Sequence, residues 1–377
     1  MIQYGRHKIS EDDIQHVVQS LQSDWLTTGP LVEQFEKEIE NVTGSPAITV
    51  NSGTAALHCA YAAINLKKDD EVITPPITFI ATQATAAFFG AKIVFTDVNS
   101  DTANIDPKSV EEKITPNTKA IVAVDFAGHP ADMHELRSIA DKYDLYLIED
   151  ASHSLGSIYY GKSVGTLADI TTFSFFPTKN ITTAEGGAIC SQDTKLLETA
   201  QRFARQGLIR NINDFKLEPD GPWHQEVHNF GLNYRLPDVL CALGISQIKK
   251  LSEFKDKRKE IFDFYTSELS NLTWLKTPTQ RDYVDPFWHL YPIQVNSELR
   301  KNLYTYLKKG NIGVQVNYLP AYRHPVFDSL RINPELFPNS EKFYRSEISI
   351  PFHLNLTQVD LQYIVEKIRD FGKTLQI

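Results

Sequence analysis

The sequence has 377 residues, a length that suits two or three domains with sizeable cores. Its 38 basic and 47 acidic side chains give a net charge of −9, which argues against a general binder of nucleic acid or membrane surfaces. The three cysteines form no CxxC pair, and no run approaches the ~20 apolar residues of a membrane span. We therefore expect a soluble, cytoplasmic protein without a metal site.

The first half of the chain predicts an α/β domain. Residues 10–22 carry an S-x-x-D capping pattern followed by apolar residues at helical spacing, which indicates a helix. Short apolar runs then alternate with helix-patterned segments, and most of these runs lack strict period-2 alternation. Strands covered on both faces have this pattern, so we expect a mostly parallel sheet. The expected strands are 46–50, 71–75, 92–98, 119–126, 145–150, 170–176 and 186–190.

The second half predicts a smaller unit. Residues 235–265 have the pattern of one long helix, which we interpret as the bridge between two domains. Short strands are expected at 289–295 and 313–318, and "TQVD" at 357–360 opens a terminal helix. We predict a large domain over 1–250 and a small C-terminal domain over 251–377.

A candidate anion site follows the first predicted strand, in "NSGTAALH" at 51–58. Gly53 permits close approach of the backbone, and Thr54 adds a hydroxyl beside the free N–H groups of a first helical turn, an arrangement suited to phosphate. The same residues also fit a simple helix cap, with Ser52 or Thr54 as the capping residue.

Polar residues also stand at the end of the strand 145–150 and just after it. Glu149, Asp150 and His153 would lie at the carboxyl edge of the sheet, where open α/β sheets bind ligands. A carboxylate there can pair with a cationic ring or a metal, or it can satisfy backbone N–H groups of the loop. The cluster is a poor metal site, because no second histidine or cysteine lies at ligand spacing.

Lys179 stands in "FSFFPTKNITTAEGG", between an apolar strand and a glycine-rich turn. Partial burial would lower the pKa of its amine and make it nucleophilic, as in a Schiff-base lysine, although a surface lysine is the commoner case. An anion site, a carboxylate and an amine, each following a predicted strand, are what pyridoxal 5′-phosphate needs.

Six motifs resemble the DegT/DnrJ/EryC1/StrS sugar aminotransferases, in the order of that family. They are "DWLTTGP", "NSGTAALH", "TPPITFIAT", "EDASHSLGS", "FSFFPTKNITTAEGGA" and "HNFGLNYRLPDVLCALGISQI". The resemblance implies a pyridoxal-phosphate enzyme of fold type I: an α/β three-layer sandwich like aspartate aminotransferase, with a smaller C-terminal α+β domain. "HLYPIQV", "VQVNYLPAY" and "FYRSEISIPFHLNL" are similar to the branch of the pseudaminic acid pathway.

The resemblance also implies roles for residues at the cofactor. Lys179 would form the Schiff base and shuttle the proton, Asp150 would pair with the ring nitrogen, and Phe79 would stack on the ring with His153 nearby. Phe79 also fits a plain core position. The implied contacts to the phosphate are Gly53, Thr54, Ala55 and Ser174, with Asn233 reaching the cofactor of a second subunit. Asn233 could instead cap a turn. Its implied role predicts a homodimer with shared active sites.

For the substrate, the resemblance implies a nucleotide-sugar pocket to which the N-terminal segment contributes. Its lining would be Tyr4, Trp25, Leu26, Thr27, Gln315, Asn317 and Tyr318, although Tyr318 also fits a packing role. The chain departs from frequent family patterns at Phe176, Ala184 and Gln206, where histidine, glycine and histidine are common.

The implied reaction moves an amino group from L-glutamate to C4 of a UDP-linked 4-keto-6-deoxy-N-acetyl sugar. One alternative is another dTDP-, GDP- or UDP-sugar aminotransferase with the same chemistry. A sugar dehydratase of the family is a second, although those enzymes typically replace the lysine by histidine. A non-catalytic regulator that binds the cofactor is a third.

Overall fold

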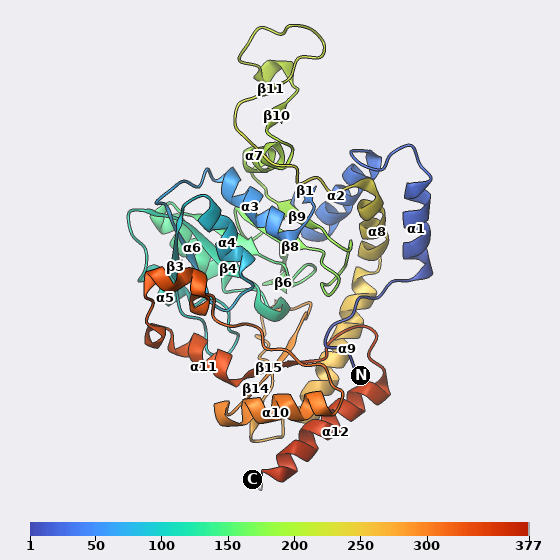
Figure 1. Ribbon diagram of the computed structural model, residues 1–377, viewed down its shortest axis with the longest axis vertical. Coiled ribbons are helices and arrows are strands. Elements are labelled where there is room, and N and C mark those ends of the chain that lie inside the picture. Colours follow the sequence, from blue (N-terminus) through green and yellow to red (C-terminus); the bar gives the residue numbers. More distant parts are fainter. Residues whose placement is uncertain (376–377) are drawn as a thin grey trace.

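A seven-stranded sheet forms the centre of the computed structural model, which describes residues 1–375 (Figure 1). Its strands, in spatial order, are β1 (Ala47–Val50), β9 (Gly187–Cys190), β8 (Ile170–Ser174), β5 (Tyr146–Asp150), β4 (Thr118–Val124), β2 (Glu71–Thr74) and β3 (Lys92–Phe95). The strand pairs β8–β5, β5–β4, β4–β2 and β2–β3 are parallel. The predicted mostly parallel sheet is therefore confirmed.

Strand β9 is the exception, because it runs antiparallel to both of its neighbours, β1 and β8. It returns directly from β8 as a hairpin, and the intervening loop carries Lys179. A continuous apolar run cannot reveal its direction, since strands buried on both faces look alike in either orientation.

Helices cover both faces of the large sheet and give the expected three layers. On one face lie α2 (Pro30–Thr43), α5 (Pro107–Glu111), α6 (Met133–Tyr143) and α8 (Asp238–Ile248). On the other lie α3 (Gly53–Ala63), α4 (Ala81–Phe88) and α7 (Thr194–Ala204). Ile121 and Val122, adjacent on β4, pack into opposite cores, which explains why this strand is apolar throughout.

The predicted N-terminal helix is α1 (Glu11–Leu21), and it has the expected capping box between Ser10 and Asp13. The Asp13 carboxylate also accepts a hydrogen bond of 2.5 Å from the buried end of Lys250, which ties α1 to the C-terminal end of α8. Exposed surface ion pairs contribute little, but this one is shielded from solvent.

The single helix predicted over 235–265 is wrong. The chain forms α8, which ends at Ile248, and then α9 (Leu251–Leu269). The backbone of Lys250 leaves the helical region, with φ of −98° and ψ of 7°, while its ammonium bonds Ser10 and Asp13. No proline or glycine marks this break in the sequence.

A smaller sheet lies in the C-terminal part, drawn orange and red in Figure 1. Its strands are β12 (Leu275–Lys276), β14 (Tyr291–Val295) and β15 (Glu347–Ile350), and they pack with α9, α10 (Ser297–Lys309), α11 (Pro338–Ser346) and α12 (Gln358–Thr374). Three short strands, β6 (Ile158–Tyr159), β7 (Lys162–Ser163) and β13 (Val284–Asp285), form a further sheet. The domain boundary after residue 250 stays a prediction.

Two expectations for this part have opposite outcomes. The predicted terminal helix, α12, follows Thr357, which forms a capping box with Asp360, and the helix buries its apolar stripe. The strand predicted at 313–318 is wrong, since only an isolated bridge joins Gln315 to Ser349. The segment forms part of the wall of the cavity described below. Its alternation of apolar and polar residues therefore reflects one side that faces the protein interior and one that faces the cavity.

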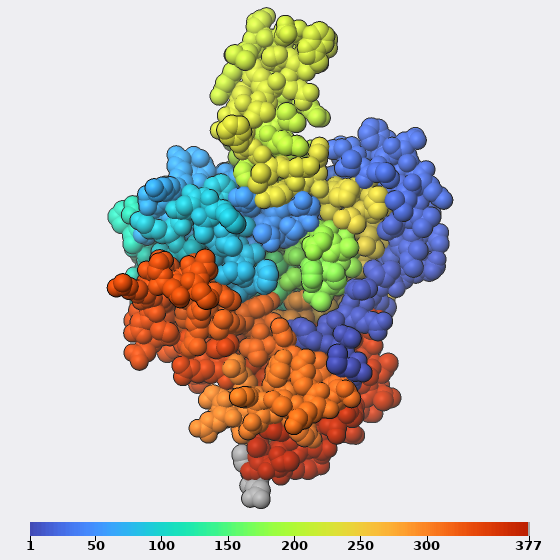
Figure 2. Space-filling model, viewed as in Figure 1, coloured from blue at the N-terminus to red at the C-terminus, as the bar shows by residue number. Residues whose placement is uncertain are grey.

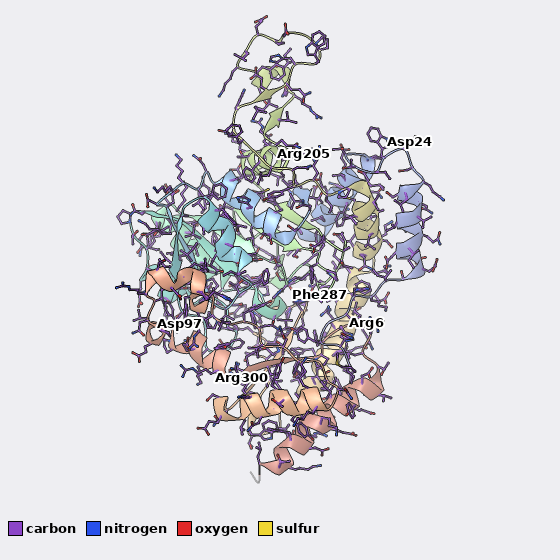
Figure 3. All side chains as sticks on the ribbon, in the orientation of Figure 1. Arg6, Asp24, Asp97, Arg205, Phe287 and Arg300 are labelled. Atoms are coloured by element: carbon purple, nitrogen blue, oxygen red, sulfur yellow. The ribbon has the colours of Figure 1, made fainter. Side chains whose placement is uncertain are left out.

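An arm formed by residues 205–232 projects from the large sheet, yellow-green at the top of Figure 2. It contains β10 (Leu208–Ile209) and β11 (Glu226–Val227), and Arg205 lies at its base (Figure 3). Trp223 and Phe230 on the arm are 73% and 94% exposed. Among the described residues, no helix is long and apolar enough to cross a membrane.

Candidate active site

A cavity of about 540 Å³ opens at the carboxyl ends of β1, β4, β5 and β8. Open α/β sheets bind ligands at this edge, because the loops that follow parallel strands converge there. The large sheet and the loops that follow it contribute Gly53, Val124, Asp150 and Ser174 to the wall. The opposite wall, next to the smaller sheet, is formed by the segments at residues 4–5 and 315–318.

The predicted anion site lies at the start of α3. Ser52 is the N-cap, and its hydroxyl accepts a hydrogen bond of 3.0 Å from the backbone N–H of Ala55. The N–H groups of Gly53 and Thr54 have no partner among the described residues, as expected at the first two positions of a helix. The helix-cap interpretation therefore holds for the N–H group of Ala55, and the N–H groups of Gly53 and Thr54 remain available to an anion.

Gly53 is required by its surroundings, because a Cβ atom there would lie 2.7 Å from the Cβ atom of Ser174. The end of β8 and the start of α3 are thus in contact, and this contact places the Ser174 hydroxyl beside the free N–H groups of α3. Ala55 does not line the cavity, and its N–H is used by Ser52. Its predicted contact to a phosphate has no free backbone donor.

Asp150 ends β5 as a buried carboxylate. One oxygen accepts from the hydroxyl of Thr82 at 2.8 Å, and the other from the hydroxyl of Ser152 at 2.6 Å. Within residues 1–375 no lysine, arginine or histidine lies within ion-pair distance of it. A buried carboxylate without a cation is costly, so the site is prepared for a positively charged group in the cavity.

Lys179 lies in the loop between β8 and β9, where its backbone N–H bonds the carbonyl of Phe176 at 2.9 Å. Its ammonium makes no hydrogen bond to a described residue, and its side chain lines the cavity. Burial lowers the pKa of Lys179 to about 8, against the opposing pull of Asp150. A neutral, nucleophilic amine is therefore accessible near physiological pH.

Capture of pyridoxal phosphate by the apo chain is expected to speed up as pH rises through about 8, the pKa of Lys179. Only the neutral amine attacks an aldehyde, and below this pH the amine is protonated. Stopped-flow absorbance over a pH series measures the rate. A midpoint at the ordinary value for lysine would contradict the depressed pKa.

Aromatic rings surround the amine. Phe79 is 60% exposed although apolar, and it faces the cavity 6.4 Å from the ring centroid of Tyr318. This exposure argues against the alternative of a plain core residue. His153 is buried, with its ring 4.3 Å from that of His289. Sequence reasoning missed His289, which also lines the cavity.

The far wall contains four of the seven predicted substrate residues. Tyr4, Gln315, Asn317 and Tyr318 all line the cavity. The Asn317 side-chain amide donates to the hydroxyl of Tyr4 at 2.5 Å, and Tyr318 approaches the His153 ring at 3.5 Å. Two segments more than three hundred residues apart in the sequence, at Tyr4 and at Asn317, thus meet in one wall of the cavity.

The other predicted residues do not reach this cavity within one chain. Trp25, Leu26 and Thr27 form an exposed turn between α1 and α2. Asn233 is exposed below the arm, where its side-chain oxygen accepts from Arg235 at 3.0 Å. Their predicted roles remain predictions.

Arg258 of α9 is a further residue that the sequence did not single out. Its buried guanidinium donates to the carbonyl oxygens of Thr178 at 3.4 Å and His289 at 3.1 Å. A third bond reaches Phe352 at 3.3 Å. Arg258 therefore fastens the loop of Lys179 to the C-terminal part, and no carboxylate among the described residues forms an ion pair with it.

Ala184, in the loop after Lys179, has a left-handed backbone with φ of 66°. Ala184→Gly is expected to raise the free energy of unfolding by about 0.5–1 kcal/mol, because the strain of a Cβ atom there outweighs the extra entropy of glycine when unfolded. Urea titration measures the change. The control, Ala188→Gly in the buried strand β9, should lower stability; a loss at Ala184 as well would contradict the strain.

These features together fit pyridoxal phosphate: free backbone N–H groups for its phosphate, a buried carboxylate for its cationic ring, and an amine for its aldehyde. The fold and cavity define an α/β enzyme of fold type I that uses this cofactor. The sequence profile of the DegT/DnrJ/EryC1/StrS aminotransferase family matches residues 7–369, and the chain belongs to this family.

Individual proteins give the same result. The chain is 38% identical to the UDP-4-amino-4,6-dideoxy-N-acetyl-beta-L-altrosamine transaminase of Campylobacter jejuni, over 98% of this chain and 96% of the other. It is similar to Helicobacter pylori PseC, an aminotransferase of pseudoaminic acid biosynthesis, with a TM-score of 0.92, 32% identity and 99% of both chains covered. The PLP form of Spr1654 from Streptococcus pneumoniae has a TM-score of 0.92 at 27% identity, with 99% of both chains covered.

The chain is therefore a pyridoxal-phosphate-dependent nucleotide-sugar transaminase. Its substrates are a nucleotide sugar and an amino donor. The presence of Lys179 in the cavity also argues against the dehydratase alternative.

Proposed function

We propose that this transaminase moves an amino group from L-glutamate to C4 of a UDP-linked 4-keto-6-deoxy-N-acetyl sugar, on a pseudaminic acid type pathway in the cytoplasm. The observation that carries the proposal is the near full-length similarity to the Campylobacter jejuni protein, whose name specifies the UDP-linked 4-amino-4,6-dideoxy-N-acetyl sugar of such a reaction. The similarity to PseC supports the same pathway.

The cofactor would be held by the start of α3 and the end of β8. The free N–H groups of Gly53 and Thr54 and the hydroxyl of Ser174 would bind its phosphate, and Phe79 would cover one face of its ring. Once bound, pyridoxal phosphate would carry the amino group from the donor to the sugar, and its ring would withdraw electrons from the reacting bonds.

The chain supplies orientation and proton transfer. The carboxylate of Asp150, fixed by Thr82 and Ser152, would keep the ring nitrogen protonated. Lys179 Nζ, with a pKa lowered to about 8, can accept a proton from the reacting carbon and return it at neutral pH. The wall of Tyr4 and Asn317 would orient the sugar so that the reacting carbon faces Lys179.

We further propose a homodimer in which each chain completes the other's site. Among the described residues, Lys179 is the only lysine or arginine in the cavity wall, too little positive charge for a nucleotide diphosphate as well as a cofactor. The exposed turn at Trp25, Asn233 and the arm with its exposed Trp223 and Phe230 would then contact the second copy. Light scattering should give twice the mass of one chain.

A substrate panel tests the proposed sugar. UDP-, dTDP- and GDP-linked 4-keto-6-deoxy sugars are each incubated with L-glutamate, and NMR establishes the position and configuration of the new amine. We expect turnover with the UDP-linked N-acetyl sugar and amination at C4. Turnover with only a GDP- or dTDP-sugar would overturn the pathway and leave the transaminase class intact.

A further inference from the structure

A buried hydrogen-bond chain lies behind the far wall of the cavity and ends at Glu347, which does not line the cavity itself. Glu347 and Ser349 stand two residues apart on β15, so their side chains point to the same face of that strand. Both are fully buried. A carboxylate in this position needs donors, and it has two of them.

Each contact in this chain has a defined length. The Ser349 hydroxyl donates to one Glu347 oxygen at 2.5 Å, and the backbone N–H of Asn317 donates to the other at 2.8 Å. The side-chain amide of Asn317 donates to Ser349 Oγ at 3.0 Å and to the Tyr4 hydroxyl at 2.5 Å. The chain thus runs from Glu347 through Ser349 and Asn317 to Tyr4.

The direction of every donor follows from the charge of Glu347. An ionised carboxylate only accepts, so Ser349 must give its proton to it. Ser349 Oγ can then only accept from Asn317, which therefore presents its NH₂ group to Ser349 and to Tyr4. Tyr4 Oη accepts this bond, so its own O–H is left to donate. The Ser349 hydroxyl also lies beside Tyr4, but it gives its proton to Glu347 and accepts from Asn317.

We propose that Glu347 is a positioning residue whose ionised form, acting through Ser349 and Asn317, directs the Tyr4 hydroxyl to donate a hydrogen bond to a carbonyl oxygen of the sugar substrate. When Glu347 is protonated it donates to Ser349 instead. The Ser349 hydroxyl is then free to donate to Asn317. The side-chain amide of Asn317 can rotate by half a turn to present its oxygen, and Tyr4 can donate to that oxygen instead of into the cavity. This inference rests on the proposed function in one respect, that a nucleotide sugar binds beside Tyr4.

The charge of Glu347 changes in an accessible pH range. Burial raises its pKa to about 8, against the opposing bonds from Ser349 and Asn317 and the charge of Arg300 on α10. Figure 3 labels Arg300. The other titratable groups that face Glu347 are Tyr4 and Tyr318, and burial raises the pKa of each above the ordinary tyrosine value. Glu347 is therefore ionised above about pH 8 and neutral below it, while both tyrosines stay protonated.

The first test follows Tyr4 without any substrate. Protein loaded with pyridoxal phosphate and labelled with ¹³C at the tyrosine Cζ atom is titrated by NMR, and Tyr4→Phe identifies the signal. We expect the Tyr4 signal to shift with a midpoint near 8, the pKa of Glu347, and to be flat in Glu347→Gln. Gln resembles the protonated acid in shape and in donating to Ser349.

Two further variants distinguish the effect of the hydrogen-bond chain from that of other nearby groups. Ser349→Ala keeps Glu347 but removes the link, so the Tyr4 signal should be flat there too. Lys179→Arg removes the Schiff base and any unreacted Lys179 amine, whose pKa in the free chain is about 8, and the Tyr4 transition should persist. A wild-type signal that does not shift, or a transition retained in Glu347→Gln, would overturn the proposal.

The second test measures binding of UDP-N-acetylglucosamine, a nucleotide sugar with an acetamido carbonyl and no ketone to react. At alkaline pH, Glu347→Gln should weaken binding by about 10-fold, the equivalent of one hydrogen bond. Well below the pKa of Glu347 it should have no effect, and in a Tyr4→Phe background it should have none at any pH. An equal loss at both pH values would indicate a merely structural role and contradict the proposal. If the wild-type protein fails to bind this sugar at every pH, the proposed nucleotide fails, and the NMR titration still decides the role of Glu347.

Discussion

Replacing Lys179 by alanine is expected to lower transamination by at least about 10⁴-fold, a loss typical of enzymes deprived of their nucleophile. The amine is the only lysine or arginine nitrogen in the described cavity wall, so no neighbour can replace it. Its backbone bond to Phe176 does not involve the side chain, and the fold should persist. Coupled assays measure the rate, and circular dichroism follows thermal unfolding.

Lys179→Arg is the matched control for charge. It keeps a cation in the cavity wall but cannot form a Schiff base, so it should be as inactive as the alanine variant and should lack the visible band of lysine-bound cofactor. Wild-type turnover in either variant would refute the assigned role of Lys179. Activity in Lys179→Arg alone would mean that charge, and not nucleophilicity, is what this position supplies.

Asp150→Asn should have the second largest effect, lowering kcat by about 10²–10⁴-fold, the usual range for an acid–base group. An amide cannot keep a ring nitrogen protonated, so the cofactor would lose much of its capacity to withdraw electrons. The side chain keeps its size between Thr82 and Ser152. The visible absorbance band of the cofactor bound to lysine should still form, because Lys179 is intact. Single-turnover kinetics with glutamate measures the step directly.

Glu149→Gln provides a control one residue away. The Glu149 side chain points to the opposite face of β5 and accepts from Thr171 at 2.9 Å. Burial raises the pKa of Glu149 well above its usual range and so favours its neutral form, which glutamine resembles. We expect nearly wild-type turnover. A loss equal to that of Asp150→Asn would show that any buried carboxylate here matters, and that pairing with the ring is not specific to Asp150.

The residues that the sequence could predict are those whose position follows from local chain geometry. Gly53, Asp150 and Lys179 each lie at the carboxyl end of a strand or shortly after it, and parallel strands end at one edge of a sheet, so the three were expected to converge. All of them line one cavity. The capping boxes of α1 and α12 were predictable for a similar reason, since each involves contacts only three residues apart.

The residues that it could not predict depend on long-range contacts. Thr82 bonds Asp150 across 68 positions, and Arg258 bonds Thr178 across 80, and neither has a local signature. The break between α8 and α9 is similar, because Lys250 leaves the helix where it reaches Asp13, some 237 positions away. The segment 313–318 shows the reverse failure, in which a strand-like pattern belongs to a cavity wall without a continuous partner strand.

The first residues of the chain are part of the enzyme's working surface. Ile2 bonds Asn311 and Gly313 through its backbone, and the carbonyl of Tyr4 accepts from Phe352. A recombinant chain shortened by five residues at this end would lose Tyr4 from the cavity wall while keeping every residue of the large sheet. Such a truncated protein should fold and still take up cofactor, yet handle its sugar poorly. A purification tag placed before Met1 is for the same reason expected to disturb this part of the cavity wall.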